Sequence, residues 1–179
     1  MLEQMTQRLQ AQRSFEAAIE TLLNDVVALH GAEYGDLQLL VGDDLVVVAH
    51  RGLTAPFLRA FRRISKADGC ACGRALREGR TVVVADVTKD PDYAAFRGEA
   101  AAAGYRAVQS TPLTTSRGRV LGMVSTHFAN VHEPTPIELD TLCRYSRIAA
   151  DYLEELVGAD RLAAQARRMH AALYADAVA

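Results

Sequence analysis

Residues 106–128, RAVQSTPLTTSRGRVLGMVSTHF, alternate apolar and polar side chains on both sides of a short polar turn. Alternation with a period of two is typical of strands, and the turn around Ser116-Arg117-Gly118 predicts a β-hairpin of residues 106–113 and 119–128. A second hairpin is predicted at residues 37–41 and 45–51, which Gly42-Asp43-Asp44 joins. These two hairpins decide the fold, because they predict an antiparallel sheet.

Helical patterns flank the hairpins. Apolar residues in steps of three and four predict a helix from Phe15 to Leu29, and Gly31 ends it. Thr135-Pro136-Ile137-Glu138 is typical of a helix start with a capping box, and the apolar stripe that follows extends this helix over residues 136–157. Three short helices, near residues 54–61, 72–78 and 91–103, are predicted around a strand at residues 81–84.

This order of elements predicts an α+β fold of the α/β-sandwich kind. We expect an antiparallel sheet of five or six strands, with the terminal helices on one face and the short helices on the other. Residues 1–30 are predicted as an N-terminal helix, and residues 31–157 as the domain itself. Within that domain the helix at residues 136–157 is expected to pack with residues 14–30. Residues 158–179 are predicted as a C-terminal helical extension.

Composition excludes several classes of function. Half of the 179 residues are hydrophobic and the formal net charge is −2, so a core can form and neither nucleic acid nor a membrane surface is an expected partner. The densest basic cluster, Arg59, Arg62 and Arg63, is interpreted as the solvent-facing side of a helix. No apolar run approaches the roughly 20 residues that span a bilayer. The three cysteines suit a reducing compartment, which predicts a cytoplasmic location.

Strand parity predicts which side chains share a face of the sheet, because residues two apart point the same way. One mostly apolar face is expected to pack on the terminal helices: Leu37, Leu39, Val41, Leu45, Val47, Ala49, Val108, Val120, Val124 and Phe128. The opposite face mixes apolar side chains with hydrogen-bonding groups: Gln38, Leu40, Val46, Val48, His50, Ala107, Gln109, Thr111, Leu121, Met123, Ser125 and His127. An apolar wall with a few convergent polar groups is typical of a small-molecule pocket. The alternative is a closed core whose polar groups satisfy one another.

The candidate ligand-binding residues come from this second face and from the segments that would cover it. They are Gln38, His50, Phe57, Phe61, Cys72, Arg74, Asp86, Phe96, Gln109, Ser125 and His127. Arg74 and Asp86 are placed either at the pocket mouth or in a surface salt bridge or turn. His50 and His127 together suggest a metal or haem ligand pair. No carboxylate or cysteine has a spacing that completes such a site, so no metal is predicted.

The cysteines have two interpretations. Cys70 and Cys72 precede and open a short helix, where the helix dipole favours a thiolate, so one of them is either a reactive thiol or a small packing residue. Cys143 is interpreted as a packing residue of the C-terminal helix.

Four stretches together resemble GAF domains of bacterial sensor histidine kinases and related signalling proteins, over residues 15–157. They are DLQLLVGDDLVVVAHRG (36–52), CACGRALREGRTVVVADVTKDPDYAAFR (70–97), GYRAVQSTPLTTSRGRVLGMVSTHF (104–128) and PTPIELDTLCRYSRIAADYLEEL (134–156). The resemblance implies a GAF/PAS-like sheet with a ligand cavity under the short helices. It also implies that residues 1–30 are a signalling and dimerisation helix, that the domain forms a homodimer through its terminal helices, and that a histidine kinase or another effector is its partner.

Departures from known GAF subfamilies narrow the expected function. The Asn-Lys-Phe-Asp-Glu signature of cyclic-nucleotide-binding members is absent, and no cysteine precedes a histidine as in bilin-binding members, so we predict no cofactor, neither haem nor bilin. Cys72 in Cys-Gly-Arg-Ala resembles a cysteine of free methionine-R-sulfoxide reductase, an enzyme with this fold. The segment where its catalytic cysteine is expected, residues 96–104, reads FRGEAAAAG and has none. We therefore predict a non-catalytic sensor of an unidentified small molecule. The alternatives are a reductase-like enzyme and a ligand-free dimerisation module.

Overall fold

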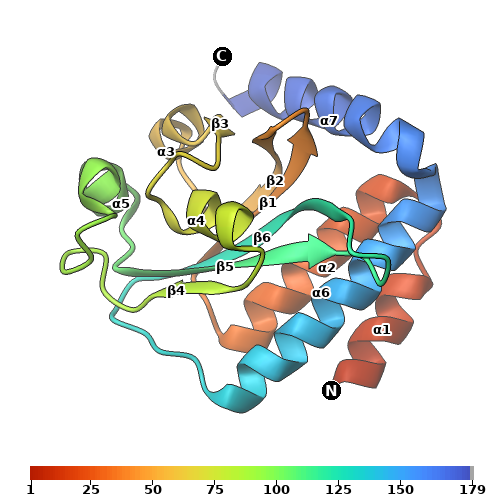
Figure 1. Ribbon diagram of the computed structural model, residues 1–179, viewed down its shortest axis with the longest axis horizontal. Helices are drawn as coiled ribbons and strands as arrows, with labels where there is room; N and C mark the ends of the chain where they lie inside the picture. The colour runs from red at the N-terminus through yellow and green to blue at the C-terminus, as the bar shows by residue number, and fades with distance from the viewer. Residues whose placement is uncertain (178–179) are drawn as a thin grey trace.

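Six antiparallel strands form one sheet in the order β3-β2-β1-β6-β5-β4 (Figure 1). The computed structural model describes residues 1–177. The two predicted hairpins are present, as β1 (Tyr34–Val41) with β2 (Asp44–Arg51) and β5 (Ala107–Thr114) with β6 (Val120–Phe128). They join through β1 and β6 at the centre of the sheet, while β3 (Arg63–Ile64) and β4 (Val82–Val84) form its edges. The predicted α+β fold with an antiparallel sheet is confirmed.

Two long helices cover one face of the sheet, α2 (Phe15–His30) and α6 (Pro136–Val157), and the shorter α1 (Leu2–Gln10) packs against both of them (Figure 1). Where one helix was expected over residues 1–30, the structure has two. The chain turns at residues 11–14, because Ser14 adopts an extended conformation and its side chain accepts a hydrogen bond from the Ala17 N–H, which starts α2. The capping box between Thr135 and Glu138 starts α6 as the sequence indicates.

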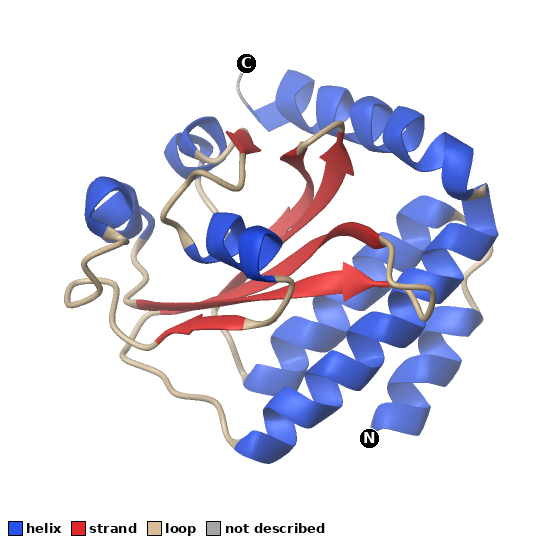
Figure 2. Cartoon of the chain, in the orientation of Figure 1, coloured by secondary structure: helices blue, strands red, loops and turns tan. Residues whose placement is uncertain are grey.

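Short helices lie over the other face (Figure 2). They are α3 (Ala55–Ala60), α4 (Ala71–Glu78), and a 3-10 turn η1 (Ala94–Phe96) that continues into α5 (Arg97–Ala103). The segment between α3 and α4 corrects one interpretation. Arg63, assigned with Arg59 and Arg62 to the wet face of a helix, belongs to the short edge strand β3, because α3 ends before it at Ala60.

The C-terminal extension folds back onto the domain. After the 3-10 turn η2 (Ala159–Arg161), α7 (Leu162–Ala177) contacts β1 and β2 and ends near α3 (Figure 1). Leu162 and Ala166 join the core under the long helices, whereas Tyr174 joins the core under the short helices. The described part of α7 is thus part of the domain's packing.

Two β-bulges change the faces that strict alternation predicts. Across β1 and β2, Leu37 faces Ala49 while Gln38 faces Val47, so Val48 is an extra residue. Across β5 and β6, Leu113 faces Gly122 while Thr114 faces Val120, so Leu121 is extra. Each bulge reverses the side on which the following residues point.

The predicted face assignment is therefore wrong in part. Four residues assigned to the long helices instead pack under the short helices: Leu45, Val47, Val108 and Val120. Three apolar residues assigned to the short helices, together with Gln109, instead pack under the long helices: Val46, Val48 and Leu121. In β5 every residue was assigned to the opposite face from the one it occupies. Both the odd-numbered and the even-numbered residues of 107–112 include apolar and polar side chains, so only the pairing with β6 shows which of them face the long helices. Leu37, Leu39, Ala49 and Val124 face the long helices as expected.

Candidate functional site

A small cavity lies between the sheet and the short helices, and its volume is about 10 Å³. Strands β1, β5 and β6 form its floor, and α3, α4 and the residue before η1 cover it. Its lining is Asp36, Phe57, Phe61, Ala71, Cys72, Tyr93, Val108, Ser110, Ser125 and His127. A volume of this size has room for about one water molecule. The cavity is where the sequence places a pocket, but it is contracted almost to a closed core.

The central polar feature of the cavity is a buried pair of Asp36 and His127. His127 Nε2 lies 2.8 Å from Asp36 Oδ1, and each residue is only 3% exposed. Because a carboxylate only accepts, Nε2 donates this hydrogen bond. His127 Nδ1 is buried and has no hydrogen-bond partner. The rings of Phe57 and Tyr105 pack against the imidazole edge-on, at centroid distances of 5.3 and 4.6 Å.

Two further polar groups on this face retain hydrogen-bonding capacity. The hydroxyls of Ser110 and Ser125 lie 2.8 Å apart across β5 and β6, and each oxygen can accept a further bond. Gln38 lies on the same face of β1, two residues beyond Asp36, and is 1% exposed. Neither its amide nitrogen nor its amide oxygen has a partner. A buried polar group without a partner costs about 1–3 kcal/mol, so a polar guest that pairs with these atoms would stabilise the fold.

The covering segments contribute thiols and phenols. Cys72 lines the cavity, and its Sγ lies 3.4 Å from Sγ of Cys70, the N-cap residue of α4. The hydroxyls of Tyr93 and Tyr105 form a 2.9 Å hydrogen bond. Burial raises the pKa of both phenols, so both stay neutral near pH 7.

Five of the predicted site residues meet at this cavity: Phe57, Phe61, Cys72, Ser125 and His127. Phe96 lies one layer further out, with its ring 5.2 Å from that of Phe61. His50 pairs with Asp36 in the strand register, and its buried Nδ1 has no partner. Burial lowers the pKa of His50, which favours its neutral form.

The remaining predicted residues are engaged elsewhere. Gln109 faces the long helices, where its Nε2 lies 3.0 Å from His30 Nε2. Arg74 forms a 2.9 Å salt bridge with Asp90. Asp86 accepts hydrogen bonds from Thr88 and Arg106, and these bonds lower its pKa to about 2. Arg74 and Asp86 therefore match the salt-bridge and turn alternatives.

Sequence reasoning missed Asp36, Tyr93, Val108 and Ser110, all of which line the cavity. Asp36 had a usable signal, since it stands two residues before Gln38 and shares its face. No sequence signal indicated Ser110, because the residues of β5 that face the cavity were predicted to be 107, 109 and 111 in place of 108 and 110.

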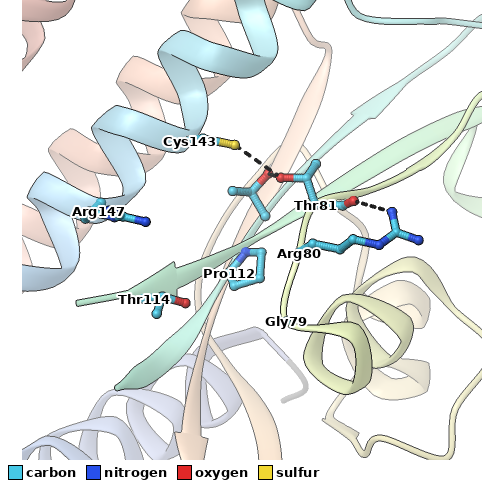
Figure 3. Close-up of a pocket in the computed structure, with 8 residues that line it drawn as sticks. Gly79, Arg80, Thr81, Pro112, Thr114, Cys143 and Arg147 are labelled. Carbon is cyan, nitrogen blue, oxygen red and sulfur yellow. Dashed lines mark hydrogen bonds between the residues drawn. The ribbon is translucent and has the colours of Figure 1, made fainter. Parts of the chain in front are cut away.

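A second, open groove of about 260 Å³ lies between β4, β5 and α6 (Figure 3). Thr81 Oγ1 lies 3.0 Å from Thr111 Oγ1 and 3.6 Å from Cys143 Sγ. Cys143, interpreted as a packing residue, is instead exposed, and its side chain points from α6 across this groove toward Thr81 (Figure 3). Arg80 and Arg147 complete its basic rim.

Within residues 1–177, no group of three or more His, Cys, Asp or Glu side chains is arranged to hold a metal ion. Nor does this described region contain a helix whose length and hydropathy would suit a membrane span.

A family model described as GAF domain matches residues 12–154. The chain belongs to the GAF family. A search among curated proteins found no match. Solved structures that resemble this GAF domain show the same fold.

Three of these structures represent the range of similar proteins. The GAF domain of a phosphoenolpyruvate-protein phosphotransferase from Coxiella burnetii superposes with a TM-score of 0.74 at 20% identity, covering 86% of this chain and 90% of that one. A domain of a putative two-component sensor histidine kinase from Sinorhizobium meliloti gives 0.65 at 20% identity, covering 88% and 99%. Free methionine-R-sulfoxide reductase from Neisseria meningitidis, solved with its substrate, gives 0.66 at 22% identity, covering 92% and 89%.

Proposed function

We propose that this GAF domain is a non-catalytic, cytoplasmic sensor that binds a small molecule between the sheet and the short helices. The observation that carries the proposal is the convergence of buried polar groups on one cavity. His127 Nδ1 is buried without a hydrogen-bond partner there, and the hydroxyls of Ser110 and Ser125 face the same space. Aromatic side chains of Phe57, Phe61 and Tyr93 supply the apolar part of the wall.

The contracted cavity implies that binding moves the cover. A volume of about 10 Å³ is far below the roughly 300 Å³ of even a small ligand pocket. The sheet is held by six paired strands, whereas the cover consists of short helices that depend on packing for their stability. We therefore expect α3 and α4 to move outward when a ligand enters.

We propose that helix α7 transmits such a movement. The Tyr174 hydroxyl donates to the Leu58 carbonyl of α3, and the Arg62 guanidinium lies 5.1 Å from the centre of the Tyr174 ring. Phe57, next to Leu58, lines the cavity. A ligand that displaces Phe57 would therefore strain the contact between α3 and α7. This coupling needs ligand affinities that differ between the two arrangements by about 1–3 kcal/mol.

We further propose that the domain works as a homodimer through its terminal helices and controls a histidine kinase or another effector. Within the described residues the exposed large hydrophobic side chains are Met1, Val131 and Ile137. Ile137 stands at the start of α6, so we place the start of α6 at the interface. Sedimentation of the full chain and of Ile137→Asp tests this placement, with a shift toward monomer expected for the variant.

Ligand binding is tested by thermal melting of the full chain against free amino acids, nucleosides and small organic acids. A compound that raises the melting temperature should lose this effect in His127→Ala and Ser125→Ala. Gln109→Ala is the matched control, because Gln109 is buried in the same sheet but faces the long helices. If Gln109→Ala abolished the ligand shift while His127→Ala kept it, the cavity would not be the binding site.

The same preparation tests the absence of catalysis. We expect no turnover of free methionine sulfoxide in the presence of a thiol reductant, because residues 96–104 supply no cysteine to the cavity. Turnover that disappears in Cys72→Ser would contradict the non-catalytic assignment.

A further inference from the structure

Cys70 and Cys72 form a buried thiol pair at the start of α4, beside the cavity but independent of any ligand in it. Their sulfur atoms are 3.4 Å apart, and the residues are 0% and 6% exposed. This separation is a contact distance, and a disulfide bond needs about 2.05 Å. Both side chains already point toward each other, so a small rotation at each would bring the sulfurs to bonding distance.

We propose that Cys70 and Cys72 are a reversible dithiol–disulfide site that reacts with small peroxides. Cys70 is the nucleophile and Cys72 is the thiol that resolves the oxidised intermediate. Cys70 is 0% exposed and does not line the cavity, whose volume of about 10 Å³ holds only about one water molecule. Peroxide therefore reaches Cys70 when the cover formed by the short helices opens.

The surroundings distinguish the two sulfurs. The Cys72 thiol donates a hydrogen bond to Cys70, and together with the Gly73 N–H this lowers the pKa of Cys70. The same hydrogen bond, followed by burial and the nearby Asp36 carboxylate, raises the pKa of Cys72. Cys70 also occupies the N-cap of α4, where the helix dipole favours negative charge. The first thiolate therefore forms on Cys70.

The reaction balances with one hydrogen peroxide. The Cys70 thiolate attacks one peroxide oxygen, the O–O bond breaks, and the departing hydroxide takes up a proton to form water, leaving a sulfenic acid on Cys70. Cys72 sulfur then attacks Cys70 sulfur, the S–O bond breaks, and the second hydroxide leaves as water. Counted from two thiols, the sulfurs lose two electrons and two hydrogens, and the peroxide becomes two waters. A dithiol reductant reverses the oxidation.

Formation of this bond would change the cavity directly. Drawing the sulfurs together pulls the Cys72 side chain along the wall that it shares with Ala71, in the first turn of α4. Oxidation would thus alter the same cover that a ligand must move.

Proteolysis gives a sharp test on the full chain, because trypsin cuts after Lys66 and Arg74 and releases both cysteines in one peptide, ADGCACGR. After brief treatment with equimolar hydrogen peroxide and alkylation, this peptide should be lighter by two hydrogens and unalkylated, and dithiothreitol should restore alkylation. Cys143, exposed on α6, is the internal reference thiol in the same sample. We expect the pair to oxidise about tenfold faster than Cys143. Equal or slower oxidation of the pair, or gain of oxygen without disulfide, would overturn the proposal.

Two variants test the assigned roles in a Cys143→Ser background. Cys72→Ser should accumulate a sulfenic acid on Cys70 that dimedone traps, whereas Cys70→Ser should react at least about tenfold more slowly. Dimedone labelling of Cys72 in Cys70→Ser, without labelling of Cys70 in Cys72→Ser, would overturn the assignment of the nucleophile.

Discussion

The two faces of the sheet are both buried, but they are built differently. Under the long helices, completely buried aliphatic side chains such as Leu9, Ile19 and Leu22 form the core, and the buried Asp25 carboxylate is paired with both Arg8 and Tyr145. Under the short helices, aromatic rings surround the Asp36–His127 pair, and His127 keeps one nitrogen without a partner. The difference teaches that two equally buried faces can have different chemistry: one is an aliphatic core, and the other is the polar and aromatic face where we propose that a ligand binds.

The largest expected effect tests whether the long-helix face carries more of the stability. Leu22→Ala should lower the free energy of unfolding by about 2–5 kcal/mol, because it leaves a cavity among long helices that cannot collapse. Leu58→Ala, equally buried on short α3, should cost less, since α3 can move inward. Urea unfolding measures both. Equal losses would remove the proposed distinction between the two faces.

The Asp36–His127 pair gives the next effect. His127→Ala should cost about 1–3 kcal/mol, because Asp36 loses its donor while still buried. The double variant with Asp36→Ala should cost less than the sum of the single variants, with a coupling of about 0.5–3 kcal/mol. A double-mutant cycle in urea measures this coupling, and additive losses would show that the pair is not energetically connected.

A pH effect sharpens the comparison from the long-helix side. Burial lowers the pKa of His30 below 6.5, and its neutral ring bridges the Val26 carbonyl and the Gln109 amide. The unfolded chain therefore binds a proton to His30 more readily than the folded chain does. The contribution of His30 to the free energy of unfolding is fully present above pH 6.5 and declines as the pH falls below it. This residue changes the free energy of unfolding by at most about 1.4 kcal/mol per pH unit. Urea unfolding between pH 5 and 7.5 measures it, and the slope should be shallower in His30→Gln.

The smallest effect is expected at Arg74. Its salt bridge with Asp90 lies outside the cavity lining, so Arg74→Ala should cost about 1 kcal/mol or less and should leave any ligand-induced melting shift unchanged. Loss of that shift would place Arg74 at the pocket mouth after all. Thermal melting with and without the stabilising compound measures both quantities.

Features that depend on residues close together in the chain could be predicted from the sequence, and features that depend on distant residues could not. Local signals were sufficient for the helix start at Thr135, because a cap involves residues within one turn. The cap at Ser14, which separates α1 from α2, was not predicted. The alternating patterns were sufficient for the two hairpins. Five predicted site residues were correctly grouped at the cavity: Phe57, Phe61, Cys72, Ser125 and His127. Each lies outside β5, and neither bulge changes the face of the sheet toward which it was predicted to point.

The sequence by itself thus determined the two hairpins, the helix that Thr135 starts, the antiparallel sheet and the family. Only the tertiary structure decided the faces of β2 and β5, the contraction of the cavity and the return of α7 onto the sheet. A bulge such as that at Val48 or Leu121 shows only when two strands are paired. Gln109 pairs with His30, and Tyr174 with Leu58, across long separations in the chain. Such contacts depend on how whole layers pack, and no local pattern encodes that packing.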